Sequence, residues 1–264
     1  MKIQISPDAR PQVRTLLIAT VITLALWFIP YAEILTYPFR VFVTFIHEGG
    51  HALAAILTGN SVASLSVATN GSGLTETYST EGGLLSRLFI SSAGYIGAIA
   101  YGTLLLFLIR RAIAARIVLV GTSILILGLT LVFGLINPIW NLSGLSGIPF
   151  TLVAGIIIAA GLFAVARFGS ARVASFFVSF LAVQCVLNAL TDLKTVLFLS
   201  SPFAAAVPND AQNMANATGV PAFFWAVIWI GISLALLSMA LRFYAVSKHA
   251  PKQQDLPFEE PLDV

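Results

Sequence analysis

Long apolar segments, separated by short polar stretches, run through almost the whole chain. A helix that crosses a bilayer needs about 20 mostly apolar residues, and about seven segments reach or approach that length. They run approximately over 15–29, 38–57, 88–109, 117–136, 150–166, 173–199 and 221–244. The pattern predicts an all-α polytopic membrane protein with about seven transmembrane helices.

Three stretches depart from this apolar pattern. Over about 61–78, polar and apolar residues alternate around Asn70-Gly71, a dipeptide typical of tight hairpin turns, so a β-hairpin is expected there. Residues 201–220 are too polar to span a membrane and predict an exposed loop or a short surface helix. Residues 248–264 are acidic and proline-rich, which predicts a disordered polar tail after a single membrane domain over 1–247.

Composition supports a bilayer location and excludes several kinds of site. Hydrophobic residues make up 58% of the 264 residues and charged residues 9%, more apolar surface than a soluble protein of this length can bury. The single cysteine, Cys185, excludes an intrachain disulfide and a cysteine zinc cage. The net charge is +3, but Lys and Arg lie at the ends of the apolar segments, which is typical of membrane anchoring and not of nucleic-acid binding.

One apolar segment contains the pattern His47-Glu48-Gly49-Gly50-His51. On a helix, positions i and i+4 lie on one face, so both imidazoles can bind one metal ion while Glu48 deprotonates a water beside it. Zinc suits this donor set because it accepts nitrogen and oxygen ligands and lowers the pKa of water to about 7. A charged side chain in lipid costs at least about 2.5–3.5 kcal/mol, so these polar groups need a function or partners.

A catalytic zinc usually has three protein ligands, so a further ligand is expected from the acidic residues. Most acids lie in the termini, near the hairpin, at a segment boundary or, like Asp210, in the polar stretch. Asp192 lies deep in an apolar segment and continues a polar stripe at helical spacing with Gln184 and Asn188. We therefore expect Asp192 as the third ligand and Asn188 as a supporting or substrate-contacting group.

These residues resemble the site-2 protease family of intramembrane zinc metalloproteases. The resemblance rests on the His47-Glu48-x-x-His51 pattern in a membrane helix, the polar hairpin after it and an Asp in a later helix. The run 47–59 is also similar to a smaller, bacterial-type branch, as are Asn209-Asp210-Ala211 and the stretch 218–221.

The resemblance implies one Zn²⁺ held by His47, His51 and Asp192, with Glu48 as the general base. The family usually places Gly directly after this Asp, whereas Leu193 follows it here. The implied location is the cytoplasmic membrane of a bacterium.

The expected activity is that of a zinc metalloendopeptidase that cleaves transmembrane or membrane-proximal protein substrates with zinc-activated water. The hairpin, with Asn70 and Gly71 at its turn, could hold an unwound substrate by β-augmentation, or it could be purely structural. The alternative function is a non-proteolytic metal-binding membrane scaffold or transporter, which predicts more intramembrane ionisable residues along a path than this chain offers.

The side of the membrane that the site faces stays open at this level. With about seven spans, the helices of His47 and Asp192 run in the same direction, and their motifs can meet at one depth. The basic stretches 110–116 and 167–172 then place the hairpin outside the cell. The basic N-terminus and the family resemblance favour the opposite side.

Overall fold

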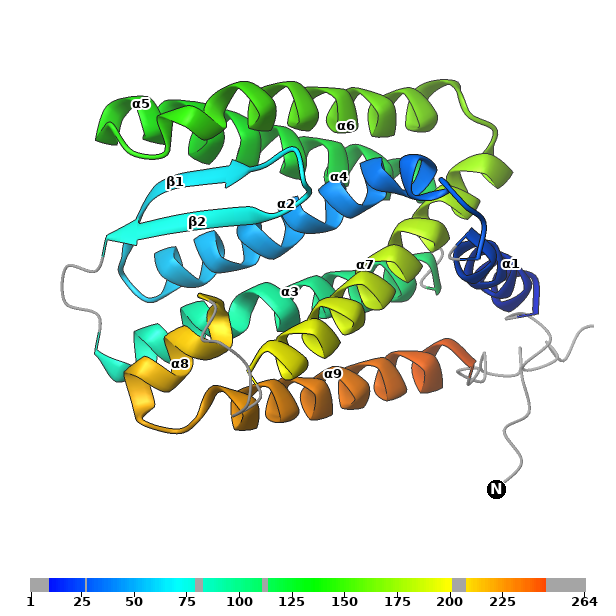
Figure 1. Cartoon of the computed structure of the whole chain (residues 1–264). Coiled ribbons are helices and arrows are strands. Elements are labelled where there is room, and N and C mark those ends of the chain that lie inside the picture. Colours follow the sequence, from blue (N-terminus) through cyan, green and yellow to red (C-terminus); the bar gives the residue numbers. More distant parts are fainter. Residues whose placement is uncertain (1–9, 27, 79–82, 111–113, 201–207, 246–264) are drawn as a thin grey trace, which may run out of the picture.

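A computed structural model describes residues 10–26, 28–78, 83–110, 114–200 and 208–245, and the predicted tail over 248–264 lies outside these residues. The fold is mostly helical, with one β-hairpin directly after the second helix (Figure 1). In chain order the elements are α1 (Arg10–Leu26), α2 (Glu33–Leu57), β1 (Ser61–Val67), β2 (Gly73–Tyr78), α3 (Leu84–Arg110), α4 (Ala115–Gly128), a π-helical turn (Leu129–Ile136), α5 (Asn137–Asn141), a 3₁₀ turn (Leu145–Gly147), α6 (Ile148–Phe168), α7 (Ala171–Leu199), α8 (Asp210–Thr218) and α9 (Ala222–Ala245).

Five helical stretches of the described residues, where about seven were expected, are long and apolar enough to cross a membrane. They are Leu84–Ile109, Ala115–Asn141, Leu145–Phe168, Ala171–Leu199 and Ala222–Arg242, and they indicate a multi-pass membrane protein. The other two expected spans form helices as well. The apolar part of α1 is short, and α2 carries Arg40 and the His-Glu-His residues, which lower its hydropathy.

The central part of helix α2 is largely buried and packs against α3 at backbone distance. Val41, Phe42 and Phe45 are buried on it. A Cβ atom placed on Gly50 would meet the carbonyl oxygen of Ala93 in α3 at less than 3.0 Å. The two helices can therefore approach this closely only because residue 50 has no side chain, as is common for small residues between membrane helices.

The predicted hairpin over 61–78 is confirmed. Strands β1 and β2 are antiparallel, with Ser61 opposite Tyr78 and Val67 opposite Gly73. At the turn, Gly71 has a φ of +81°, a conformation that glycine adopts without steric cost. The Asn70 side chain accepts a 2.9 Å hydrogen bond from the backbone N–H of Ser72.

The turn is fixed to α2 by two hydroxyl groups. The Tyr37 hydroxyl donates to the carbonyl of Thr69 at 2.7 Å, and the Thr44 hydroxyl donates to that of Gly71 at 2.8 Å. These bonds place the hairpin along the helix that carries both histidines.

The two strands of the hairpin differ in what covers their backbone. Side chains from the neighbouring helices bond to the main chain of β1: Asn137 donates to Val62 O at 2.8 Å, and Thr151 accepts from Val67 N at 2.8 Å. Among the described residues, no side chain from outside the hairpin bonds to the main chain of β2. One edge of the sheet is therefore occupied and the other is open.

A carboxylate on the hairpin adds a further attachment to the same neighbouring helices. Glu76 accepts hydrogen bonds from Ser143, which follows α5, and from Ser64 in β1. These two hydroxyls stabilise the charged form and lower the pKa of Glu76 below its ordinary value.

The polar stretch that follows α7 contains a short helix, one of the two structures expected there. Asn209 caps α8 by accepting from the backbone N–H of Gln212 at 3.0 Å, and Gly219 ends the helix with a φ of +75°. Ala211 and Met214 are buried, and α8 packs against α3 and α9.

Replacing Gly50 by Ala should destabilise the protein, because the new methyl group meets backbone that has no freedom to move aside. Overpacking of this kind costs about 1–3 kcal/mol. We expect a lower midpoint of thermal unfolding in detergent. The matched control is Gly121→Ala in α4, where an added Cβ has no heavy atom within 4 Å. Equal midpoints for both variants would contradict the close contact.

Candidate metal centre

His47 and His51 lie on one face of α2, as their spacing predicted. Their Nε2 atoms are 3.1 Å apart. The Nδ1 atom of His51 lies 2.6 Å from the carbonyl oxygen of Ile90 in α3. Because a carbonyl only accepts hydrogen bonds, Nδ1 must carry a hydrogen, and in the neutral ring Nε2 then has the lone pair that a metal ion needs.

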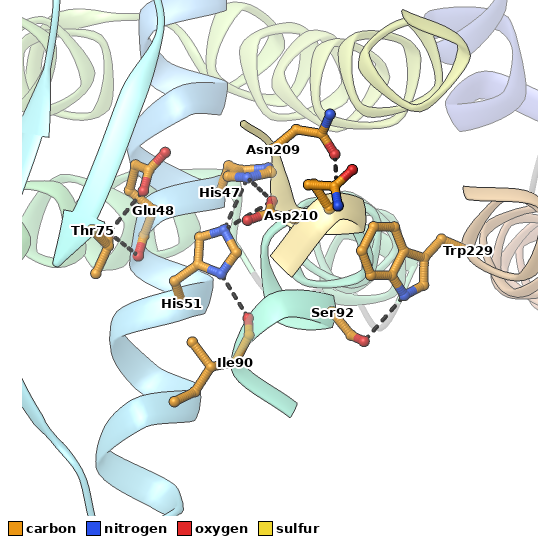
Figure 2. Close-up of polar contacts among 10 residues, drawn as sticks. His47, Glu48, His51, Thr75, Ile90, Ser92, Asn209, Asp210 and Trp229 are labelled. Carbon is orange, nitrogen blue, oxygen red and sulfur yellow. Dashed lines mark hydrogen bonds and ion pairs between the residues drawn. The ribbon is translucent and has the colours of Figure 1, made fainter. Parts of the chain in front are cut away.

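The carboxylate beside the two imidazoles belongs to Asp210, the first residue of α8 (Figure 2). Its Oδ2 atom lies 3.3 Å from Nε2 of His47 and 3.3 Å from Nε2 of His51. Four-coordinate zinc with ligand bonds of about 2.0–2.2 Å keeps its ligand atoms roughly 3.3–3.6 Å apart. The three atoms therefore form a triangle close in size to one face of a zinc tetrahedron.

The charge of Asp210 is stabilised by the histidines. Burial raises the pKa of this carboxyl, but His51 and His47 lower it by more, so that it lies well below its ordinary value. An ionised carboxylate with two imidazoles suits a divalent cation. His47, His51 and Asp210 are accordingly a group that could hold a metal ion.

The expected third ligand, Asp192, does not contact the imidazoles. It faces the same cavity from α7, together with Asn188. The Asn188 side chain donates to the Oε1 atom of Gln184 at 2.9 Å, so the predicted polar stripe exists. Asn188 and Asp192 line the cavity, whereas Gln184 is buried and bonds to Thr23 of α1. Asp210, and not Asp192, lies beside the two imidazoles in this structure, and Asp192 as a metal ligand stays a prediction.

The reason for this difference is that Asp210 was excluded by its location in a polar stretch. A residue outside the apolar segments can still reach a site at membrane depth when its helix folds back onto the bundle, as α8 does against α3 and α9. The similarity of Asn209-Asp210-Ala211 to the bacterial-type branch was the available signal. The helix-capping role of Asn209 fits that signal, because the cap places Asp210 at the beginning of the helix.

Helix α3 shapes the other side of the metal centre. A Cβ atom on Gly94 would meet ring atoms of both His47 and His51 at less than 3.0 Å. The ring of Tyr95 packs edge-on against His47, with centroids 4.6 Å apart, and continues to Trp229 of α9 at 5.5 Å. Gly94 of α3 therefore borders the candidate metal centre.

An open cavity of about 730 Å³ surrounds the centre. Residues of α2, β2, α3, α7 and α8 line it, including Glu48, Gly73 and Thr75. Of the predicted turn residues, Gly71 lines the cavity, and Asn70 acts through its bond within the turn. Strand β2 therefore forms one wall of the cavity that contains the candidate metal centre.

Asp210→Ala should weaken zinc binding by more than about 100-fold, because loss of an outer-shell partner alone costs 10–100-fold. Asp192→Ala should bind zinc as the wild type does. Metal content of the purified variants after dialysis against a zinc buffer measures both. The opposite result, zinc lost in Asp192→Ala and kept in Asp210→Ala, would restore the assignment made from the sequence.

Gly94→Ala should also reduce zinc binding, although residue 94 offers no ligand atom. The added methyl group occupies the space of the two imidazole rings, so at least one ring must turn away. Metal titration is the measurement, and Gly97→Ala, one turn along α3, is the control because its Cβ would meet only ordinary contacts. Unchanged affinity in Gly94→Ala would show that the rings have another stable arrangement.

Comparison with known proteins agrees with this geometry. A family described as Peptidase M50B-like matches residues 17–240, a range that contains the whole metal centre. No curated protein and no solved structure matches the chain. The matched range covers most of the sequence. The chain therefore belongs to the Peptidase M50B-like family, which is site-2 protease-like, and this membership implies a metallopeptidase.

Proposed function

We propose that this protein is an intramembrane zinc metalloendopeptidase that cleaves transmembrane or membrane-proximal segments of other proteins. The observation that carries the proposal is the triangle of ligand atoms from His47, His51 and Asp210, with edges of 3.1, 3.3 and 3.3 Å, beside the buried Glu48. The family match over 17–240 supports the same reaction class.

The residues present fit zinc in number and chemistry. His47, His51 and Asp210 would supply two nitrogen ligands and one oxygen ligand, as expected for a catalytic site with one open position. When bound, zinc supplies Lewis acidity, which acidifies a water and polarises a carbonyl group. The carbonyl of Ile90 keeps His51 in the tautomer that this binding requires.

Glu48 is the proposed general base. It follows His47 directly, it is 5% exposed, and it lines the cavity. Its carboxylate would accept the proton of the attacking water and then donate it to the amine that leaves when the peptide bond breaks. Among the described residues that line the cavity, the other acidic residues are Asp192 and Asp210. Neither of them is adjacent to His47 or His51 in the sequence.

The open edge of β2 is the proposed binding site for the substrate backbone. A transmembrane helix keeps its carbonyl groups in internal hydrogen bonds, so the segment to be cut must first become extended. An extended segment can add to a free strand edge through main-chain hydrogen bonds. In this hairpin β1 is covered and β2 faces the cavity that contains Glu48, so β2 is the strand in position to receive it.

The wall formed by α7 would contact the substrate from another side. Asn188 and Asp192 line the cavity one helical turn apart, and their polar groups could bond to the backbone or side chains of an extended segment. The five apolar spans among the described residues support a reaction in a membrane, and the bacterial cytoplasmic membrane is part of this proposal.

Glu48→Gln should retain zinc and lose cleavage. The amide has nearly the same shape but cannot accept the proton, and general acid–base catalysis contributes about 10²–10⁴-fold. Zinc content and cleavage of transmembrane peptides by the purified protein in proteoliposomes are measured together. Glu33→Gln, an exposed position at the beginning of the same helix, is the control.

Unchanged cleavage in Glu48→Gln would remove Glu48 as the base. A wild-type protein that binds zinc and cleaves none of a broad set of transmembrane peptides would favour the metal-binding scaffold or transporter.

A further inference from the structure

The position of the Glu48 carboxylate is not determined by the helix that carries it. Successive residues of an α-helix differ by about 100° around its axis, so Glu48 lies to one side of the face shared by His47 and His51. A base that acts at the metal centre therefore needs a second element to hold its carboxylate at the right place.

The second element is the middle of strand β2. The Thr75 hydroxyl lies 2.7 Å from the Oε2 atom of Glu48 and 3.1 Å from its backbone oxygen (Figure 2). A hydroxyl donates one hydrogen, and the bond to the ionised carboxylate is the stronger of the two. Within the described chain, Thr75 is the only hydrogen-bond donor to this buried carboxylate.

The neighbouring residues of the strand press against the same side chain. A Cβ atom on Gly73 would meet Cγ of Glu48 at 2.6 Å and Cγ2 of Thr44 at 2.7 Å. Thr44 lies one turn before Glu48 on α2 and bonds to the carbonyl of Gly71. The strand is thus attached to α2 on one side of Glu48, and the carboxylate lies in a slot between Thr44, Gly73 and Thr75.

We infer that Thr75 is the positioning residue of Glu48, and that the strand which receives the substrate also holds the catalytic base in place. This inference rests on the proposed function. It deepens that function by linking two steps that could otherwise be independent, because a displacement of β2 on substrate binding moves the donor to Glu48 as well.

The consequence is a defect in turnover when the hydroxyl is removed. Thr75→Val keeps the shape of the side chain but leaves the carboxylate of Glu48 without its donor. The ligand triangle of His47, His51 and Asp210 makes no contact with Thr75, so zinc binding should persist. The main chain of β2 is unchanged, so substrate binding should persist too.

The experiment compares the wild type, Thr75→Val and Thr75→Ser as purified full-length proteins, with one transmembrane peptide that the wild type cleaves. For Thr75→Val we expect kcat to fall roughly 10- to 100-fold, the size of one hydrogen bond to a charged group. KM and zinc content should stay within about twofold, since the groups responsible for both are intact. Thr75→Ser, which keeps the hydroxyl, should restore most of kcat.

A control and a double variant separate positioning from general damage. Thr103→Val removes a hydroxyl that bonds only within α3, to Ala100 O at 2.9 Å, and should leave kcat unchanged. In a Glu48→Gln background, Thr75→Val should cause no further loss, because residues that act as a unit are not additive.

Several results would overturn the inference: kcat of Thr75→Ser as low as that of Thr75→Val, a rise in KM alone, or full additivity with Glu48→Gln. If Thr75→Val does not fold, Gly73→Ala tests the same slot, since it keeps the hydroxyl but crowds Glu48, and it should lower kcat with zinc retained. Failure of the proposed function is recognised separately, by a wild type that cleaves no peptide or by a fully active Glu48→Gln.

Discussion

The close contact between α2 and α3 is the constraint on which the rest of the structure depends. Gly50 lets the two backbones approach, since a side chain there would meet the carbonyl of Ala93. Gly94 leaves the space in which the imidazole rings of α2 lie. At the same contact, the carbonyl of Ile90 receives the Nδ1 hydrogen of His51. A membrane bundle has little hydrophobic driving force between its helices, so small residues and a hydrogen bond determine where α2 sits.

Once α2 is placed, its polar residues each find a partner from a different element. The two histidines face Asp210 of α8, Glu48 bonds to Thr75 of β2, and His51 bonds to the backbone of α3. Unpaired ionisable groups are costly in an apolar environment. Assembly of the bundle therefore both satisfies these groups and forms the candidate metal centre, and a change that disturbs one element should also disturb the others.

The hydrogen bonds that attach the hairpin to the neighbouring helices involve its two strands unequally. Side chains of the neighbouring helices occupy the main chain of β1, and the turn is bonded to α2 through Thr44 and Tyr37. Among the residues that the structure describes, no side chain from outside the hairpin bonds to the main chain of β2, and this strand lines the cavity. An open strand edge invites pairing with another chain. Here that edge lies beside a buried glutamate and a candidate zinc site, where pairing would serve the proposed reaction.

The amino-acid sequence by itself determined the local features of this protein. Hydropathy located the helices, although among the described residues five of the seven expected spans are long and apolar enough to cross a membrane. The i, i+4 spacing placed His47 and His51 on one face, and Asn70-Gly71 placed the hairpin turn. Each of these follows from residues close together in the chain, where helix and turn geometry leave few choices.

Only the tertiary structure decided which residues of other elements meet the histidines. Asp192 lies in an apolar segment of the sequence, whereas Asp210 lies in a polar stretch. Nevertheless, α8 folds back onto α3 and α9 and brings Asp210 to both imidazoles. The roles of Gly94 and Thr75 depend in the same way on distances between separate elements. Hydropathy and periodicity indicate which face of each segment is apolar and which is polar. They contain no information on which segments pack together or on the depth at which their polar groups lie.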